Sequence, residues 1–275
     1  MNDAPHPPSI RRILVALDTD ERSAASLEEA ARLAAGLEAE LVGLFIEDAE
    51  LLQAAALPMT RMVPQQARTL ADFDPASMQR AYRIWSAEAH RSLEAVAAQW
   101  RIKWSFQIAR GIYAEQLMAT LRAGDLLALA SSKHQRRSRT GVAALTVAAQ
   151  APCSLFLMYR RWETWKPVVV LYEGSEETLT MGRTLATIYN LPLVTLVLGQ
   201  SEEAAQSQTT AVRHYLGSAD RPANLILVSP VSAERIGDTL RELSPGIIIF
   251  DRRGKLAPTI ETALEVVNSS VLSLG

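Results

Sequence analysis

Short apolar runs alternate with helical periodicities along the whole chain. In the first half, four apolar runs and one stretch that alternates polar and apolar residues, at 103–109, predict strands, and amphipathic spacing predicts a helix ahead of each later strand. The predicted strands cover residues 13–17, 41–46, 103–109, 126–130 and 154–158, and the helices cover residues 27–37, 82–100, 112–121 and a segment that begins at Gly141. Strands that alternate with helices indicate parallel β/α units, so this half is predicted to be a doubly wound α/β domain.

The second half repeats the same alternation. Its predicted strands cover residues 168–172, 193–198, 225–228, 247–250 and 271–274, with helical periodicity between them. The turns after the first strand of each half are also alike, LDTDERS at 17–23 and YEGSEET at 172–178. Self-similarity on this scale indicates a tandem duplication. We therefore predict two α/β domains, at residues 10–160 and 167–275, joined by a polar bridge. Residues 49–77 break the rhythm and are interpreted as an excursion that begins with a short helix.

Composition limits the classes of partner. The formal net charge of −2, from 28 basic and 30 acidic residues, provides no overall field that would attract nucleic acid or an anionic membrane. A single cysteine, Cys153, excludes an intramolecular disulfide and is interpreted as a small buried hydrophobe. The first ten residues lack the pattern of a signal peptide, and no apolar run approaches the roughly 18 residues of a membrane span. A cytoplasmic location without membrane insertion is expected.

The stretch 124–160 carries the candidate chemistry. A polar loop follows the strand at 126–130, and the carboxyl end of a parallel strand is where such sheets bind ligands. The loop holds Lys133, Arg136, Arg137 and Arg139. Three interpretations stay open: a solvated basic loop, a phosphate or anion site built from guanidinium groups, and a nucleic-acid contact. The last is disfavoured because the basic patch is single and the chain is acidic.

Several segments in order resemble the universal stress protein family. They are ILVALDTDERS at 13–23, EEAARLAAGLEAELVGLFIED at 28–48, GDLLALASS at 124–132 and GVAALTVAAQAPCSLFLM at 141–158. The second half is similar to a degenerate second copy. The resemblance implies tandem Rossmann-like domains that pack as a pseudo-dimer within one chain, in imitation of the family's homodimer.

The resemblance also implies a nucleotide site with missing parts. Family members that bind ATP carry small residues in the loop after the fourth strand, so that main-chain N–H groups can approach phosphate oxygens. Here the first two glycines of that motif become Ala130 and Lys133, Gly141 matches the third, and Val142 replaces the following hydroxyl residue. Asp18 matches the aspartate that accepts hydrogen bonds from the nucleotide. In the second copy that position is Glu173, and the second loop is too short for the motif although Gly254 lies in it.

These positions define the candidate nucleotide or anion site. It comprises Asp18, Thr19, Ala130, Ser131, Lys133, Arg136, Arg137, Arg139, Gly141 and Val142. No cofactor is firmly indicated; ATP, AMP or a bound anion are the candidates, and ATP binding is expected to be weak or absent.

No other chemistry is indicated by the sequence. The four histidines lack metal-ligand spacing, and there is no nucleophile elbow or Walker loop, so neither a metal nor a catalytic residue is predicted. The leading prediction is a non-catalytic stress or regulatory module that acts through a protein partner or self-association, for example as a dimer. The alternative is a nucleotide-binding stress protein that uses Asp18 and the loop 131–141 for sensing or slow ATP hydrolysis.

Overall fold

The computed structural model describes most of the chain. The described residues are 10–17, 21–55, 61–62, 71–72, 75–130, 147, 150–158, 166–216, 224–267 and 269–275. Their contacts divide them into two compact units. One unit contains the elements from β1 to α4, and the other contains β6, β7 and every later element.

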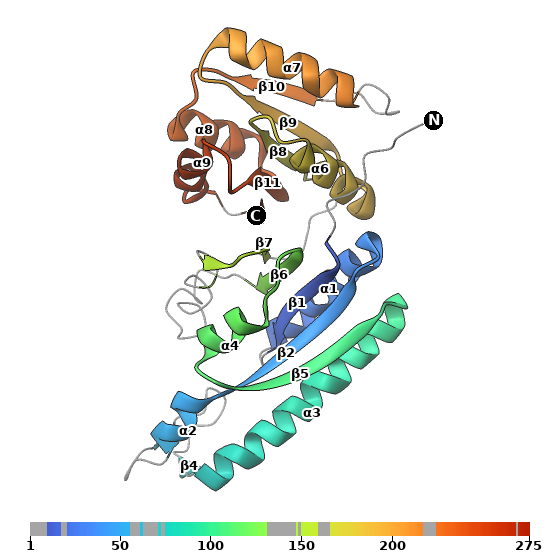
Figure 1. Ribbon diagram of the computed structural model, residues 1–275, viewed down its shortest axis with the longest axis vertical. Coiled ribbons are helices and arrows are strands. Elements are labelled where there is room, and N and C mark those ends of the chain that lie inside the picture. Colours follow the sequence, from blue (N-terminus) through green and yellow to red (C-terminus); the bar gives the residue numbers. More distant parts are fainter. Residues whose placement is uncertain are drawn as a thin grey trace. The chain divides into compact units, whose positions relative to one another are not determined.

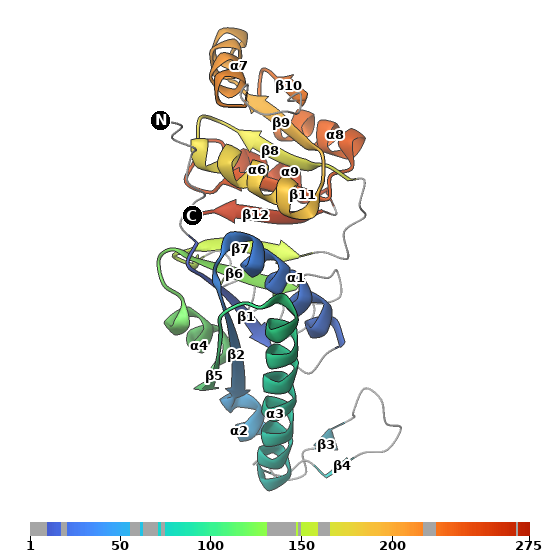
Figure 2. The same cartoon turned by 90° about the vertical axis from the view of Figure 1, so that its right-hand side faces the viewer.

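The first of these units is a parallel sheet with helices on both faces. Strand β2 (Glu40–Asp48) lies between β1 (Arg12–Leu17) and β5 (Trp104–Gly111), and both pairings are parallel. Helices α1 (Glu21–Leu37) and α3 (Pro75–Trp100) pack together on one side of it, whereas α4 (Tyr113–Thr120) lies on the other (Figures 1 and 2). Continuous apolar sequence in β1 and β2 gives strands that are buried on both faces.

Helix α3 follows the amphipathic prediction. Its buried side chains recur every three or four residues and form one stripe against the sheet: Met78, Tyr82, Ser86, Ala89, Leu93 and Ala97. His90 adds edge-on ring contacts to Trp104 and Phe106 of β5. The excursion holds α2 (Ala49–Ala55) and two very short paired strands, β3 (Arg61–Met62) and β4 (Ala71–Asp72), which the sequence did not predict.

The other unit is a larger mixed sheet. Its strand order is β10-β9-β8-β11-β12-β7-β6. The strands are β6 (Asp125–Ala130), β7 (Ser154–Met158), β8 (Val168–Tyr172), β9 (Leu193–Leu198), β10 (Asn224–Val228), β11 (Ile247–Asp251) and β12 (Ser270–Leu274). The helices are α6 (Glu176–Tyr189), α7 (Glu202–Leu216), α8 (Ala233–Leu243) and α9 (Ala257–Leu264). The chain leaves β8 toward β9 on one side and returns to β11 on the other, so the order reverses between β8 and β11.

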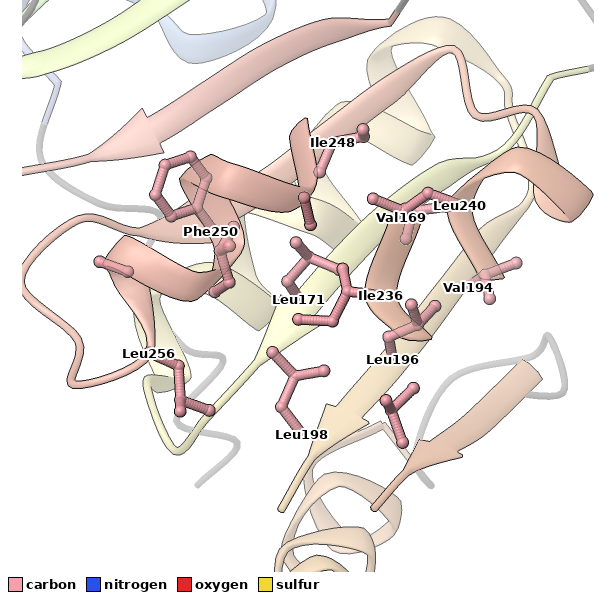
Figure 3. Packing of buried hydrophobic residues seen from close by; sticks show 14 residues of the cluster. Val169, Leu171, Val194, Leu196, Leu198, Ile236, Leu240, Ile248, Phe250 and Leu256 are labelled. Carbon is pink, nitrogen blue, oxygen red and sulfur yellow. The ribbon is translucent and has the colours of Figure 1, made fainter. Parts of the chain in front are cut away.

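The core of the C-terminal half lies between this sheet and helices α8 and α9. Alternate residues of β8, β9 and β11 point to the same side and pack on the buried faces of the two helices (Figure 3). The labelled side chains are Val169, Leu171, Val194, Leu196, Leu198, Ile236, Leu240, Ile248, Phe250 and Leu256. This cluster packs β8 and β11 on the same two helices, and the loops that follow the two strands begin side by side because the strands are parallel neighbours.

One antiparallel pairing joins the two repeats within this unit. Strand β12 pairs with β7 in an antiparallel manner, with Leu272 opposite Phe156. Every other pair of neighbouring strands in this unit is parallel. Each of the two strands is the last of its repeat, so this pairing links the end of one repeat to the end of the other. The expected fold class, two tandem α/β repeats, is confirmed. The domain boundaries 10–160 and 167–275 stay predictions.

Within the described residues, no helix is both long enough and apolar enough to span a bilayer.

Candidate functional site

Most of the predicted site lies outside the described residues. Asp18, Thr19 and the loop residues Ser131, Lys133, Arg136, Arg137, Arg139, Gly141 and Val142 all fall there. Ala130 is described: it ends β6 and pairs with Met158 of β7. Strand β1 ends at Leu17, the residue before Asp18 in the sequence, and the assembly of the site stays a prediction.

The equivalent place in the second repeat is described in full. Strands β8 and β11 are parallel neighbours, with Val170 opposite Ile249, and they end at Tyr172 and Asp251. This is the point of the sheet where the strand order reverses, and ligands of open α/β sheets bind outside the carboxyl ends of strands at such a point. Glu173 follows β8 there, and the loop that leads to α9 follows β11.

Glu173 reaches across this switch point and binds the opposite loop. Its Oε2 accepts a hydrogen bond from the main-chain N–H of Leu256 at 2.9 Å, and the N–H of Lys255 also stabilises the carboxylate. The carboxylate lies directly on Gly254, so close that a β-carbon there would overlap it. Helix α9 begins at Ala257 and adds the partial positive charge of its N-terminus. The carboxylate thus occupies a small anion cradle.

The other carboxylate oxygen of Glu173 is poorly satisfied. Oε1 is buried and has no hydrogen-bond partner among the described residues, and the same is true of Gln208 Oε1 on α7. Gln208 Nε2 faces the main-chain oxygen of Glu173 at 3.5 Å. Burial raises the pKa of Glu173 above its ordinary value, the nearby Asp251 carboxylate adds to the rise, and the N–H groups of Leu256 and Lys255 oppose it.

The arginines beside the cradle are already engaged. The guanidinium of Arg253 lies 2.8 Å from Glu177 Oε2 and 3.3 Å from Asp251 Oδ1. Arg252 turns the other way, and its Nη2 donates to the main-chain oxygen of Cys153 at 3.0 Å. Neither of these two guanidinium groups is therefore without an acceptor among the described residues, whereas Lys255 of the same loop is exposed.

The described part of the chain offers no metal centre, and its cysteine is not an activated nucleophile. No cluster of three or more His, Cys, Asp or Glu residues there could hold a metal ion. Burial, and then the charge of Asp125, raise the pKa of Cys153 to about 11, so its thiol stays protonated.

The contact between Glu173 and Gly254 was not predicted by sequence reasoning. Each residue was singled out separately, the first as the counterpart of Asp18 and the second as the glycine of a short loop. Two features of the sequence could have indicated the contact. Glutamate is one methylene longer than the aspartate it replaces, and the facing loop has a glycine that leaves space for the longer side chain.

The model of the universal stress protein family matches residues 9–158, more than half of the chain. This chain belongs to the universal stress protein family. Three of the solved structures to which it is similar share the fold over nearly its whole length. A universal stress protein from Archaeoglobus fulgidus DSM 4304 has a TM-score of 0.64 at 12% identity, covering 98% of this chain and 97% of its own. A functionally unknown protein from Pseudomonas aeruginosa PAO1 has a TM-score of 0.62 at 14% identity, with 97% and 93% covered.

A third structure, of a putative universal stress protein from Pseudomonas aeruginosa UCBPP-PA14, has a TM-score of 0.59 at 15% identity, covering 97% of this chain and 94% of its own. No curated protein matches the sequence. At these identities the likeness shows the fold alone. In this universal stress protein family member, the second repeat lies beyond the matched residues, and its switch point holds the chain's own carboxylate.

Proposed function

We propose that this universal stress protein family member is a non-catalytic regulatory module that acts through protein contacts and binds ATP or AMP weakly or not at all. The observation that carries the proposal is the Glu173 carboxylate on the N–H of Leu256. A phosphate group that approached the same N–H would meet a carboxylate of the same sign. The second repeat therefore has no open nucleotide cradle.

The sequence of the first repeat supports the same proposal. Lys133 places a long side chain where a phosphate loop needs open backbone, and Ala130 and Val142 replace two further small or hydroxyl-bearing positions of the motif. Phosphate binding by a loop depends on close approach of main-chain N–H groups, which side chains at these positions obstruct. The neighbouring arginines do not rebuild that cradle.

Titration calorimetry with ATP and with AMP tests the nucleotide part. We expect no binding tighter than about 100 μM, which corresponds to only about 5.5 kcal/mol of binding free energy. Protein freshly purified without nucleotide should also release no adenine nucleotide when it is denatured and examined by mass spectrometry. Low-micromolar binding, or stoichiometric co-purified nucleotide, would overturn this proposal in favour of a nucleotide-sensing protein.

The edge of the smaller unit supports a role in protein contacts. Within its unit, β5 pairs with β2 alone among the described strands, and it ends the strand order. Ile108 on β5 is 56% exposed, and Ile112 just beyond the strand is 44% exposed. An open strand edge with exposed apolar side chains is a typical surface for association.

A pair of substitutions tests whether this edge mediates self-association. Ile108→Lys places a charge on the edge, and we expect it to weaken self-association by about tenfold in sedimentation velocity, as a charge in an apolar contact does. Ile84→Lys is the control, because Ile84 is 63% exposed on the solvent side of α3. Equal effects of the two variants would argue against the β5 edge.

A further inference from the structure

The loop after β11 has the geometry of an anion-binding loop. Main-chain N–H groups of Lys255 and Leu256 converge on one carboxylate, and α9 starts at the next residue. Gly254 has no side chain, and the carboxylate of Glu173 occupies the space that a β-carbon would take at this position. Consecutive N–H groups beside a glycine and a helix N-terminus are how α/β proteins hold phosphate oxygens. Here the bound anion belongs to the chain itself.

Glu173 is a poor permanent ligand for this cradle. Its Oε2 accepts a hydrogen bond from the main-chain N–H of Leu256, whereas its Oε1 is buried without a hydrogen-bond partner among the described residues. An unsatisfied buried oxygen is costly, and a carboxylate offers fewer oxygens than a tetrahedral phosphate. The carboxylate of Glu173 therefore occupies the cradle but satisfies only one of its two oxygens there.

We propose that Glu173 is an internal ligand that closes an anion site for a terminal phosphoryl group at the start of α9. This inference rests on the proposed function, because it explains why the second repeat has no open cradle. Removal of the carboxylate frees the N–H groups of Lys255 and Leu256 for an external phosphate. The closed form is then an autoinhibitory contact built into the repeat.

The surroundings suit an entering phosphate once the carboxylate is gone. A β-carbon at Gly174 would meet no heavy atom within 4 Å, so the chain beside Glu173 faces open space. Arg253 and Lys255 supply positive charge at the rim, and both residues are exposed. Asp251 and Glu177 oppose an anion, but both contact Arg253 and are partly neutralised by it.

Inorganic phosphate binding to charge-matched variants tests this inference. Glu173→Ala opens the cradle. Glu176→Ala removes one exposed negative charge from the same turn and leaves the cradle filled, and Glu173→Gln removes the same charge but keeps the side-chain volume. Each full-length protein is titrated with phosphate by calorimetry at constant ionic strength. We expect Glu173→Ala to bind one phosphate at least about tenfold more tightly than the wild type and both controls, since only it frees the N–H donors.

The outcomes separate the cradle from general electrostatics. An equal gain in Glu176→Ala would overturn the inference, because net charge alone would then explain it. No gain in a folded Glu173→Ala protein would also overturn it, and Glu173→Ser, judged by the same criterion, replaces this variant if alanine prevents folding. ATP binding by the wild type would contradict the proposed function instead, so the two failures are distinguishable.

Discussion

Gly182 of α6 lies directly on Val170 of β8, with no space for a β-carbon between them. Val170 is fully buried, and Gly182 is on the buried face of its helix. The helix rests on the strand through this glycine, and the same strand carries Glu173 at its end. Close packing at Gly182 therefore holds the first β/α unit of the second repeat in place.

Substitution of this glycine is expected to destabilise the protein. Alanine normally stabilises a helix interior by about 1 kcal/mol relative to glycine, but overpacking a core costs about 1–3 kcal/mol. We expect Gly182→Ala to lower the free energy of unfolding by about 1–2 kcal/mol in urea titrations, because the clash with rigid Val170 outweighs the helix propensity.

Gly237→Ala is the matched control. Gly237 is also a buried glycine within a helix, α8, but its added β-carbon would lie 3.3 Å from Cγ2 of Val266, which is 59% exposed and free to move. We expect this variant to be neutral or more stable than the wild type. Destabilisation of both variants to the same extent would show that the contact with Val170 does not decide the result.

The strands could be predicted because their cause is local. Buried parallel strands need continuous apolar runs, and each run identified in the sequence became a strand with ends within about two residues. The half-exposed β5 was predicted from its alternation instead. The start of helix α9 also has a local cause, because Pro258 is well suited to the first turn of a helix that begins at Ala257. Strands β3 and β4 were missed, since two residues are too few to show periodicity.

The candidate site could be predicted only in its parts. Glu173 and Gly254 were identified from their positions after the first and fourth strands of the second repeat. Their contact depends on the parallel pairing of β8 with β11, which brings together segments far apart in the sequence. No local pattern encodes that Glu173 is long enough to cross the switch point and bind the N–H of Leu256.

The contact between Gly254 and Glu173 predicts a suppressible mutation. Gly254→Ala places a methyl group where the carboxylate lies, so it must displace Glu173 and break its hydrogen bond to Leu256. We expect a loss of about 1–3 kcal/mol in unfolding free energy. Adding Glu173→Ala should recover at least half of that loss, whereas adding Glu177→Ala should recover none. A double-mutant cycle with a coupling below about 0.5 kcal/mol would contradict the contact.

The raised pKa of Glu173 predicts how stability changes with pH. Burial raises the folded-state pKa above its unfolded value, so ionisation of Glu173 favours the unfolded chain. Its contribution to stability is complete below the unfolded pKa and is lost as the pH rises through the folded pKa. Glu173→Gln removes this titration. Relative to wild type, Glu173→Gln should therefore be more stable at pH 7 than at pH 4, so the difference in unfolding free energy (variant minus wild type) should be more positive at pH 7.

Urea denaturation of both proteins at the two pH values measures this difference, with Glu176→Gln as the control for removing a neighbouring charge. The prediction fails if the relative stability of Glu173→Gln is unchanged or moves in the opposite direction as the pH rises.

The thiol of Cys153 is expected to be protected in the folded protein. Cys153 is 1% exposed, and burial together with Asp125 raises its pKa to about 11. Only the thiolate attacks a disulfide reagent, and at pH 8 a pKa of about 11 leaves about a hundredfold less thiolate than an ordinary cysteine has. We expect the native protein to react with a chromogenic aromatic disulfide at least about a hundredfold more slowly than the chain unfolded in guanidinium, while Cys153→Ala provides the blank. Equal rates in the two states would show that the folded protein does not bury this residue.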